Sequence, residues 1–408
     1  MKIINDSAIY LFGEIFSKLI PFLLLPYLTR KLGLEGYGEL ANIQAYIVLA
    51  LVFIGLSQDG AITRYYYFHG KKSIGLVITS GMILSLMLAF LLVVFSVWVE
   101  NLIFLYISLA SLSQTFLKVQ LSLRQCQKRP LDYTAIQMFS GLSTVIVTVL
   151  LFEYVEAKFE YRVLAIILAN FSAFLIGFYL YRKNEKLKLS FSWKIRKKGF
   201  LYILTFGFPL IFHQLSFFMK GQLDRILIYE YFTPSELGVY AAGFQLAGIF
   251  SVLLMAVNKA TVPYLYEGLK KGTINYLIIL RWFKLSFLVV AIPGLCAYLI
   301  PDFIYQLILG GQFAGAKYYS VVFLFGLGLN VPYLLLVNFL FYHGKNKYIA
   351  YSTMSSSVLY VSFIYIFLNM GLKWVPYALF ISNLILVLIL YAVSRKIAKE
   401  QGDKLVFQ

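Results

Sequence analysis

The chain has 408 residues, of which 61% are hydrophobic and only 13% are charged. A soluble domain carries about 25% charged residues, so this composition excludes an ordinary soluble protein and indicates a membrane protein. The formal net charge of +18 is large enough for a nucleic-acid-binding protein. Here, however, the cations lie in short segments between apolar runs long enough to span a bilayer, so nucleic acid is not an expected partner.

The beginning of the chain reads as a membrane span and not as a cleavable signal. The apolar run after Ser7 is long, contains Glu14 and Lys18, and is followed by many more spans. The two cysteines, Cys126 and Cys296, show no pairing pattern, so no disulfide framework is predicted.

We predict an all-α integral membrane protein with about twelve transmembrane helices in two six-helix bundles. A helix of about 20 residues crosses the roughly 30 Å of hydrocarbon. In chain order the predicted spans are 8–28, 39–57, 74–98, 102–121, 132–152, 162–181, 200–222, 237–257, 276–300, 317–341, 348–369 and 374–394.

The charges of the loops predict the topology. Lys and Arg concentrate on the cytoplasmic side of membrane proteins. With the N-terminus inside, every cytoplasmic segment is basic and the outer segments carry few cations; the most basic loop is RKNEKLKLSFSWKIRKKG. We therefore expect both termini in the cytoplasm. The expected parts are an N-terminal bundle at 1–181, a cytoplasmic linker at 182–199, a C-terminal bundle at 200–394 and a cytoplasmic tail at 395–408.

The two predicted bundles repeat one another. With a shift of 200 residues, segment 32–46 lies over segment 232–246, and Gly38 matches Gly238. In both halves the match covers the loop after the first span and then the second span. Two bundles of the same orientation, related by an axis along the membrane normal, are a known transporter plan with the substrate between them.

At several of these segments the chain resembles a known family. The similar stretches are YLTRKLGLEGYGELA (27–41), FGFPLIF (206–212), DRILI (224–228), ELGVYAAGFQLA (236–247) and VPYLYE (262–267). They resemble the signatures of Wzx-type polysaccharide flippases, which belong to the multidrug/oligosaccharidyl-lipid/polysaccharide exporter superfamily. The resemblance extends over the whole chain, including the number of spans and the break at the basic loop.

The resemblance implies a function in polysaccharide biosynthesis, such as that of O-antigen or lipopolysaccharide. It implies transfer of an undecaprenyl-diphosphate-linked oligosaccharide from the inner to the outer leaflet of the cytoplasmic (inner) membrane. The implied partners are this lipid-linked glycan, membrane lipids, a polysaccharide polymerase and a chain-length regulator. The resemblance implies no catalytic residues.

Moving a diphosphate and a glycan through hydrocarbon requires a wet, cationic cavity between the halves, because one charged side chain at the membrane centre already costs about 2.5–3.5 kcal/mol. The candidate substrate-binding cations within or near spans are Lys18, Lys118, Lys220, Lys259, Arg281 and Lys284. Each has a simpler interpretation. Lys18 can pair with Glu14 on the same helix face, Lys220 can extend to the interface, and the other four can anchor cytoplasmic helix ends.

Two acids are candidates for coupling transport to a gradient of H⁺ or Na⁺. Glu14 is the better candidate, because a partly desolvated carboxylate can exchange a proton or bind Na⁺. Asp224 is the second, although with Arg225 it can form a structural pair or helix cap.

No enzyme motif is recognisable, and no cofactor or metal site is expected. The Gly-Lys segments at 70–73 and 344–346 lack the spacing of a phosphate-binding loop, and the three histidines lack metal-ligand spacing. The chain is therefore not expected to be an enzyme. The alternatives are a drug exporter of the same superfamily, a membrane glycan polymerase or acyltransferase, and an assembly scaffold.

Overall fold

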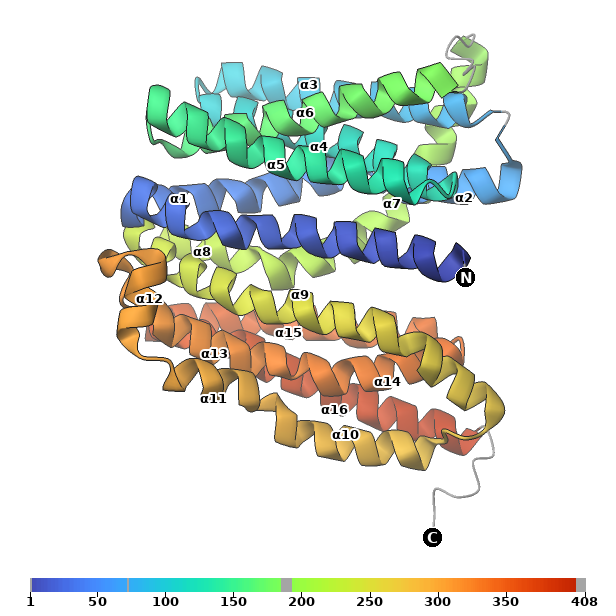
Figure 1. Cartoon of the computed structure of the whole chain (residues 1–408), viewed down its shortest axis with the longest axis vertical. Helices are drawn as coiled ribbons and strands as arrows, with labels where there is room; N and C mark the ends of the chain where they lie inside the picture. Colours follow the sequence, from blue (N-terminus) through green and yellow to red (C-terminus); the bar gives the residue numbers. More distant parts are fainter. Residues whose placement is uncertain (1, 72, 185–192, 401–408) are drawn as a thin grey trace. The chain divides into compact units, whose positions relative to one another are not determined.

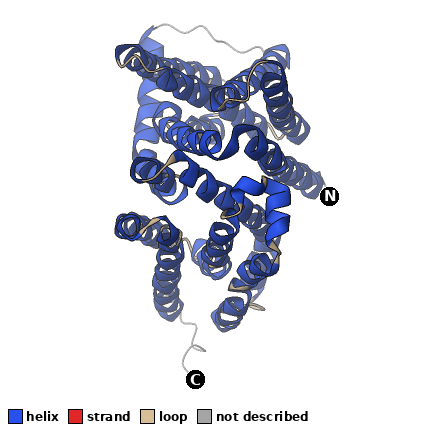
Figure 2. Cartoon of the chain, turned by 90° about the vertical axis from the view of Figure 1, so that its left-hand side faces the viewer, coloured by secondary structure: helices blue, strands red, loops and turns tan. Residues whose placement is uncertain are grey.

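The computed structural model describes residues 2–71, 73–184 and 193–400, and all regular structure in these ranges is helical (Figures 1 and 2). Eleven of the helical segments are long and apolar enough to cross a membrane, and the first of these, Phe12–His69, has 58 residues and accommodates two spans. The predicted all-α membrane fold with about twelve spans is therefore confirmed.

The helices of the N-terminal part are long and closely spaced in the sequence. They are α1 (Lys2–Gly55), α2 (Gln58–His69), α3 (Ile74–Trp98), α4 (Leu102–Cys126), α5 (Pro130–Tyr154), α6 (Phe159–Asn184) and α7 (Trp193–Gly221).

The C-terminal part is more interrupted. Its α-helices are α8 (Leu223–Tyr231), α9 (Pro234–Lys271), α10 (Tyr276–Val290), α11 (Ile292–Leu299), α12 (Asp302–Leu309), α13 (Ala316–Gly328), α14 (Asn330–Tyr342), α15 (Asn346–Met370) and α16 (Tyr377–Glu400). Short 3₁₀ helices lie at Gly311–Phe313 and Leu372–Trp374.

Helix α1 differs from the sequence prediction in one respect. Residues 29–38, predicted as a loop between two spans, are helical on both sides of a single kink at Gly33, where φ is 67° and ψ is −170°. A side chain is strained at such a positive φ, and glycine is not. Figure 1 shows the two segments of α1 running back alongside each other.

Contacts divide the chain into two compact units. The first contains residues 1–24 and 39–218, and the second contains residues 25–38 and 219–408. The segment around the α1 kink therefore packs with the second unit, and α7 packs with the first unit as far as Phe218. The predicted division into bundles at 1–181 and 200–394 stays a prediction, and residues 185–192 of the linker and 401–408 of the tail lie outside the described residues.

In the first unit, α4 packs against α2, α3, α5 and α6. Its buried cluster includes Leu56, Val77, Leu123 and Ile203 of α7. Helix α7 approaches closely because Gly207 faces the backbone of Leu56, where a Cβ would overlap the carbonyl oxygen.

In the second unit, α13 packs against α9, α11 and α16, and α14 packs against α10 and α16. The buried cluster includes Tyr276, Phe339, Leu390 and Ile397. The Tyr276 hydroxyl lies 3.0 Å from Ser394 Oγ, so this polar group stays hydrogen-bonded inside the apolar core.

Candidate functional site

The first group of polar side chains within spans lies where α1 ends and α2 begins. Leu56 and Ser57 have φ values of 43° and 50°, in the left-handed region that non-glycine residues rarely adopt. Such backbone costs about 1–3 kcal/mol for each residue, and it concentrates at functional sites. The break lies at the end of the predicted second span, 39–57, and separates α1 from α2.

A polar pocket surrounds this break. It is lined by Leu51, Gly55, Ser57, Gln58, Asp59, Thr115, Lys118 and Gln214. Gln214 Nε2 of α7 donates to Ser57 Oγ at 2.5 Å, and Gln58 Nε2 donates to Ser85 Oγ of α3 at 2.5 Å. These bonds connect the break to α3 and α7 and fix its geometry.

Lys118 brings a positive charge into this pocket from α4. Its ammonium interacts electrostatically with Asp59, which lies in the first turn of α2. The pocket thus contains a cation, a carboxylate and the N-terminus of a helix, which favours negative charge.

The second group of polar side chains surrounds Lys220, near the end of α7. The Lys220 ammonium donates to Ser356 Oγ of α15 at 2.6 Å and to Asn383 Oδ1 of α16 at 2.9 Å. Asn383 Nδ2 in turn donates to the carbonyl oxygen of Gly326 at 3.1 Å, and Ser356 Oγ to that of Ser382 at 2.7 Å. Lys220 is therefore held by two neutral acceptors, which orient its charge without neutralising it.

Asp224 and Arg225 lie next to this group and form a buried ion pair. The side chains of Asp224 and Arg225 are 1% and 8% exposed, and Arg225 Nη1 lies 3.1 Å from Asp224 Oδ1. The Tyr240 hydroxyl donates to Asp224 Oδ2 at 2.5 Å, and the guanidinium lies 4.4 Å from the ring centroid of Phe244. Such a saturated pair fits a structural role that holds α8 against α9.

Glu14 and Lys18 form a pair within α1. Lys18 Nζ lies 2.8 Å from Glu14 Oε1, and the side chains of Lys18 and Glu14 are 49% and 28% exposed. The nearby Gln137 Nε2 of α5 donates to Ser17 Oγ at 2.8 Å. The Glu14 carboxylate is therefore paired with Lys18 and only partly exposed at the protein surface.

The remaining three candidate cations, Lys259 of α9 and Arg281 and Lys284 of α10, are exposed in the second unit. The structure thus distributes the six cations over both units. It places Lys118 near Asp59, Lys18 beside Glu14 and Lys220 between two helices.

The residues that position these cations were not predicted from the sequence. The predicted span 39–57 ends at the break before Asp59, but Leu56 and Ser57 themselves gave no sign of a left-handed backbone. Ser356 and Asn383 lie 136 and 163 residues from Lys220 in the chain. The one available signal was the presence of polar residues such as Asp59 and Asn383 inside otherwise apolar runs.

A protein-family model, described as polysaccharide biosynthesis protein, matches residues 3–269, more than half of the chain. The chain belongs to this family. The similarity to polysaccharide exporters in the sequence is therefore confirmed at the level of the family.

Two relatives from Haemophilus influenzae support the same assignment. A protein of the Lsg locus is 44% identical over 401 residues, covering 98% of this chain and 100% of that protein. A second membrane protein is 42% identical over 402 residues, covering 98% of this chain and 99% of that protein.

Solved structures share the fold of this family member at low sequence identity. The lipid II flippase MurJ in an inward closed conformation has a TM-score of 0.72 and 15% identity, with 94% of this chain and 87% of that chain covered. An inward-facing MATE multidrug resistance transporter of the MOP superfamily has a TM-score of 0.69 and 15% identity, with 96% and 100% covered. The chain is thus a member of the polysaccharide biosynthesis protein family that shares the fold of these transporters.

Proposed function

We propose that the protein moves an undecaprenyl-diphosphate-linked oligosaccharide from the inner to the outer leaflet of the cytoplasmic membrane by alternating access. The observation that carries this proposal is the placement of Lys118 and Lys220 within spans of a polysaccharide-family transporter. A diphosphate cannot cross hydrocarbon unaided, and cations at intermediate depths lower that barrier.

In this mechanism the cations bind the diphosphate in succession. The set is Lys18, Lys118, Lys220, Lys259, Arg281 and Lys284. In a wet cavity each ammonium–phosphate contact contributes on the order of 1–4 kcal/mol. No single contact is then strong enough to trap the substrate, and loss of one cation slows transport without abolishing it.

The free energy for transport comes from an ion gradient or from removal of the transported glycan at the outer leaflet. Glu14 is the preferred coupling residue, because its carboxylate is partly exposed and can exchange H⁺ or bind Na⁺. Asp224 is less suited, because Arg225 and Tyr240 already occupy its oxygens. We place both termini in the cytoplasm, with a polysaccharide polymerase and a chain-length regulator of O-antigen type as partners.

The test is reconstitution of the purified protein with a fluorescent undecaprenyl-diphosphate glycan and a reagent that reaches only one leaflet. Wild-type protein should move the glycan, and the double variant Lys118→Gln/Lys220→Gln should do so slowly. Lys158→Gln is the matched control, because Lys158 pairs with Glu156 in a loop outside the spans. Transport of cationic drugs in place of the glycan would instead favour a drug exporter, and no transport at all would contradict the proposal.

A further inference from the structure

Two apolar pockets are lined by corresponding helices in the two halves of the chain, but at opposite ends of those helices. The α3 pocket is lined by α1, α3 and α4, which contain the second, third and fourth spans. The α14 pocket is lined by α9, α10 and α14, which belong to the corresponding spans of the second half. Their volumes are similar, about 400 and 390 Å³, and lie within the range of about 300–1,000 Å³ of ligand pockets.

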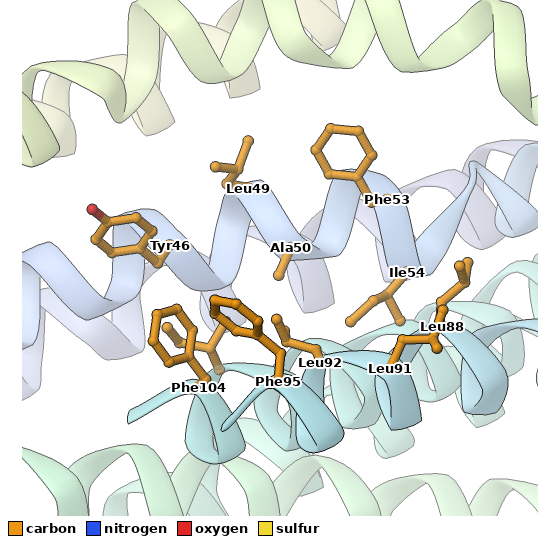
Figure 3. A pocket seen from close by; sticks show the side chains of 11 residues that line it. Tyr46, Leu49, Ala50, Phe53, Ile54, Leu88, Leu91, Leu92, Phe95 and Phe104 are labelled. Carbon is orange, nitrogen blue, oxygen red and sulfur yellow. The ribbon is translucent and has the colours of Figure 1, made fainter. Parts of the chain in front are cut away.

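The α3 pocket lies near the turn between α3 and α4. Figure 3 shows Ala50 and Ile54 of α1 pointing towards Leu91 and Leu92 of α3. Phe95, which belongs to the last turn of α3, also lines the pocket, as does Phe104 in the first turn of α4. The lining is apolar apart from the Tyr46 hydroxyl.

The α14 pocket lies near the connection between α9 and α10. Ile274 of that connection lines it, together with Tyr264 of α9 and Trp282 of α10. Tyr264 and Trp282 are 75% and 40% exposed, so the pocket is open to its surroundings. Leu334 contributes to its wall from α14.

The predicted spans put the two pockets at opposite sides of the membrane. Between the α3–α4 turn and the α9–α10 connection the chain crosses five times, through the spans Leu102–Cys126, Pro130–Tyr154, Phe159–Leu180, Trp193–Gly221 and Pro234–Lys271. An odd number of crossings puts the two connections on opposite sides, whichever end of the chain is inside. In the predicted topology the α14 pocket is in the inner leaflet and the α3 pocket in the outer leaflet.

The α14 pocket differs from its counterpart by its polar groups. Asn338 Nδ2 of α14 donates to Asn258 Oδ1 of α9 at 2.7 Å, and both side chains line the pocket. Arg281 directly precedes Trp282, and Lys270 and Lys271 end α9 on the same side, where Lys271 is paired with Glu267. If the apolar chain of a lipid occupied this pocket, the headgroup of that lipid would therefore lie near these cations. Cations at this level attract lipids with an anionic headgroup.

We propose that the α14 pocket binds the polyisoprenyl chain of the lipid-linked substrate in the inner leaflet, and that the α3 pocket receives the same chain in the outer leaflet. This proposal rests on the function proposed above. Lipid tails are as apolar as a leucine-lined pocket, so burial alone gives no preference for a ligand over bulk lipid. Selectivity must come from the fit of the branched chain and from the cations near its phosphate.

The experiment uses Trp282 as a fluorescent reporter of the pocket. The full-length variant Trp98→Phe/Trp193→Phe/Trp374→Phe retains Trp282 alone and is placed in phosphatidylcholine nanodiscs with brominated acyl chains, which quench the indole they contact. Undecaprenyl phosphate should displace the brominated chain and restore emission. Phosphatidic acid, which has a phosphate but two acyl chains, should require about a tenfold higher mole fraction, equivalent to about 1.4 kcal/mol.

Two variants serve as controls, one for the position of the tryptophan and one for filling of the pocket. Leu288 is 74% exposed on the same helix, so a tryptophan placed there with Trp282→Phe reports bulk lipid and should not distinguish the two lipids. Leu334→Phe fills the pocket and should remove the preference seen at Trp282. Equal recovery with both lipids would make the pocket an ordinary acyl groove and overturn the proposal, as would a Trp282 signal that no lipid changes.

The readout separates this proposal from the proposed function. If undecaprenyl phosphate binds selectively near Trp282 but the reconstituted protein does not transport the glycan, only the proposed function is contradicted. If Leu334→Phe loses the preference for the polyisoprenyl lipid but transports the glycan at the wild-type rate, only the proposed role of the pocket is contradicted.

Discussion

Gly38 of α1 and Gly238 of α9 cross with their backbones in contact. A Cβ on Gly38 would overlap the carbonyl oxygen of Pro234 and lie 3.0 Å from the amide nitrogen of Gly238, and a Cβ on Gly238 would overlap the carbonyl oxygen of Leu34. Both residues belong to the second contact unit. They are also the two glycines that match when the halves are shifted by 200 residues. Two segments that the repeat makes equivalent therefore pack directly against each other at this crossing.

Alanine at either glycine should therefore separate the two helices. Overpacking of this kind costs about 1–3 kcal/mol, so we expect Gly38→Ala and Gly238→Ala to lower the thermal unfolding temperature and to impair transport together. The control is Gly221→Ala, because a Cβ at Gly221 meets nothing within 4 Å. Unfolding temperatures and transport rates of Gly38→Ala that match those of Gly221→Ala would show that the crossing is not needed.

The ion pair of Asp224 and Arg225 gives a prediction on stability. Asp224→Asn leaves the Arg225 guanidinium buried without its counter-charge, which typically costs about 3–5 kcal/mol. Tyr240→Phe removes only one hydrogen bond to the carboxylate and should cost about 1–3 kcal/mol. Thermal unfolding in detergent measures both. An Asp224→Asn variant as stable as Tyr240→Phe would indicate that the guanidinium finds other compensation.

Lys220 allows a structural role to be distinguished from a role in transport. Lys220→Met removes the donor to Asn383 Oδ1, which costs about 1–3 kcal/mol, but it also removes a charge that is costly to bury. Because these two effects oppose each other, stability should change little. Transport should decrease, and Lys220→Arg should retain more of it. Normal transport by the methionine variant would exclude Lys220 from the substrate path.

The sequence was sufficient for the fold because long apolar runs have few alternatives in a membrane. Backbone groups in lipid must be paired within the segment, so a run of the length of 74–98 can only be a helix. It was insufficient at α1, where Arg30, Lys31 and Gly33 resemble a loop although the chain remains helical. It was also insufficient at the sites, because contacts such as that of Lys220 with Asn383 depend on packing between distant helices.

The topology prediction is tested by reporter fusions. Charges in the described part of the linker, such as Lys194, Arg196 and Lys197, should keep that loop in the cytoplasm. A reporter active only in the cytoplasm should therefore function when inserted at Lys194 or fused after Gln408. A reporter active only in the periplasm should be silent at both places and active in the α3–α4 turn. Periplasmic activity at Lys194 would contradict the twelve-span topology and exchange the leaflets of the two apolar pockets.

The pair of Glu14 and Lys18 provides a test of coupling. If Glu14 exchanges an ion, Glu14→Gln should remain folded and inserted, because the glutamine keeps the size of the side chain and a partly exposed pair contributes only about 1 kcal/mol to stability. Its transport should no longer depend on the proton or sodium gradient. Lys18→Gln removes the partner of the Glu14 carboxylate but keeps the carboxylate. Its transport should therefore be slower but still depend on the gradient. Transport by Lys18→Arg should be closer to that of the wild type. The measurement is glycan transport in proteoliposomes with an imposed H⁺ or Na⁺ gradient at matched protein content. If transport by Glu14→Gln depends on the gradient as strongly as in the wild type, Glu14 is only a structural partner of Lys18 and the coupling ion binds elsewhere.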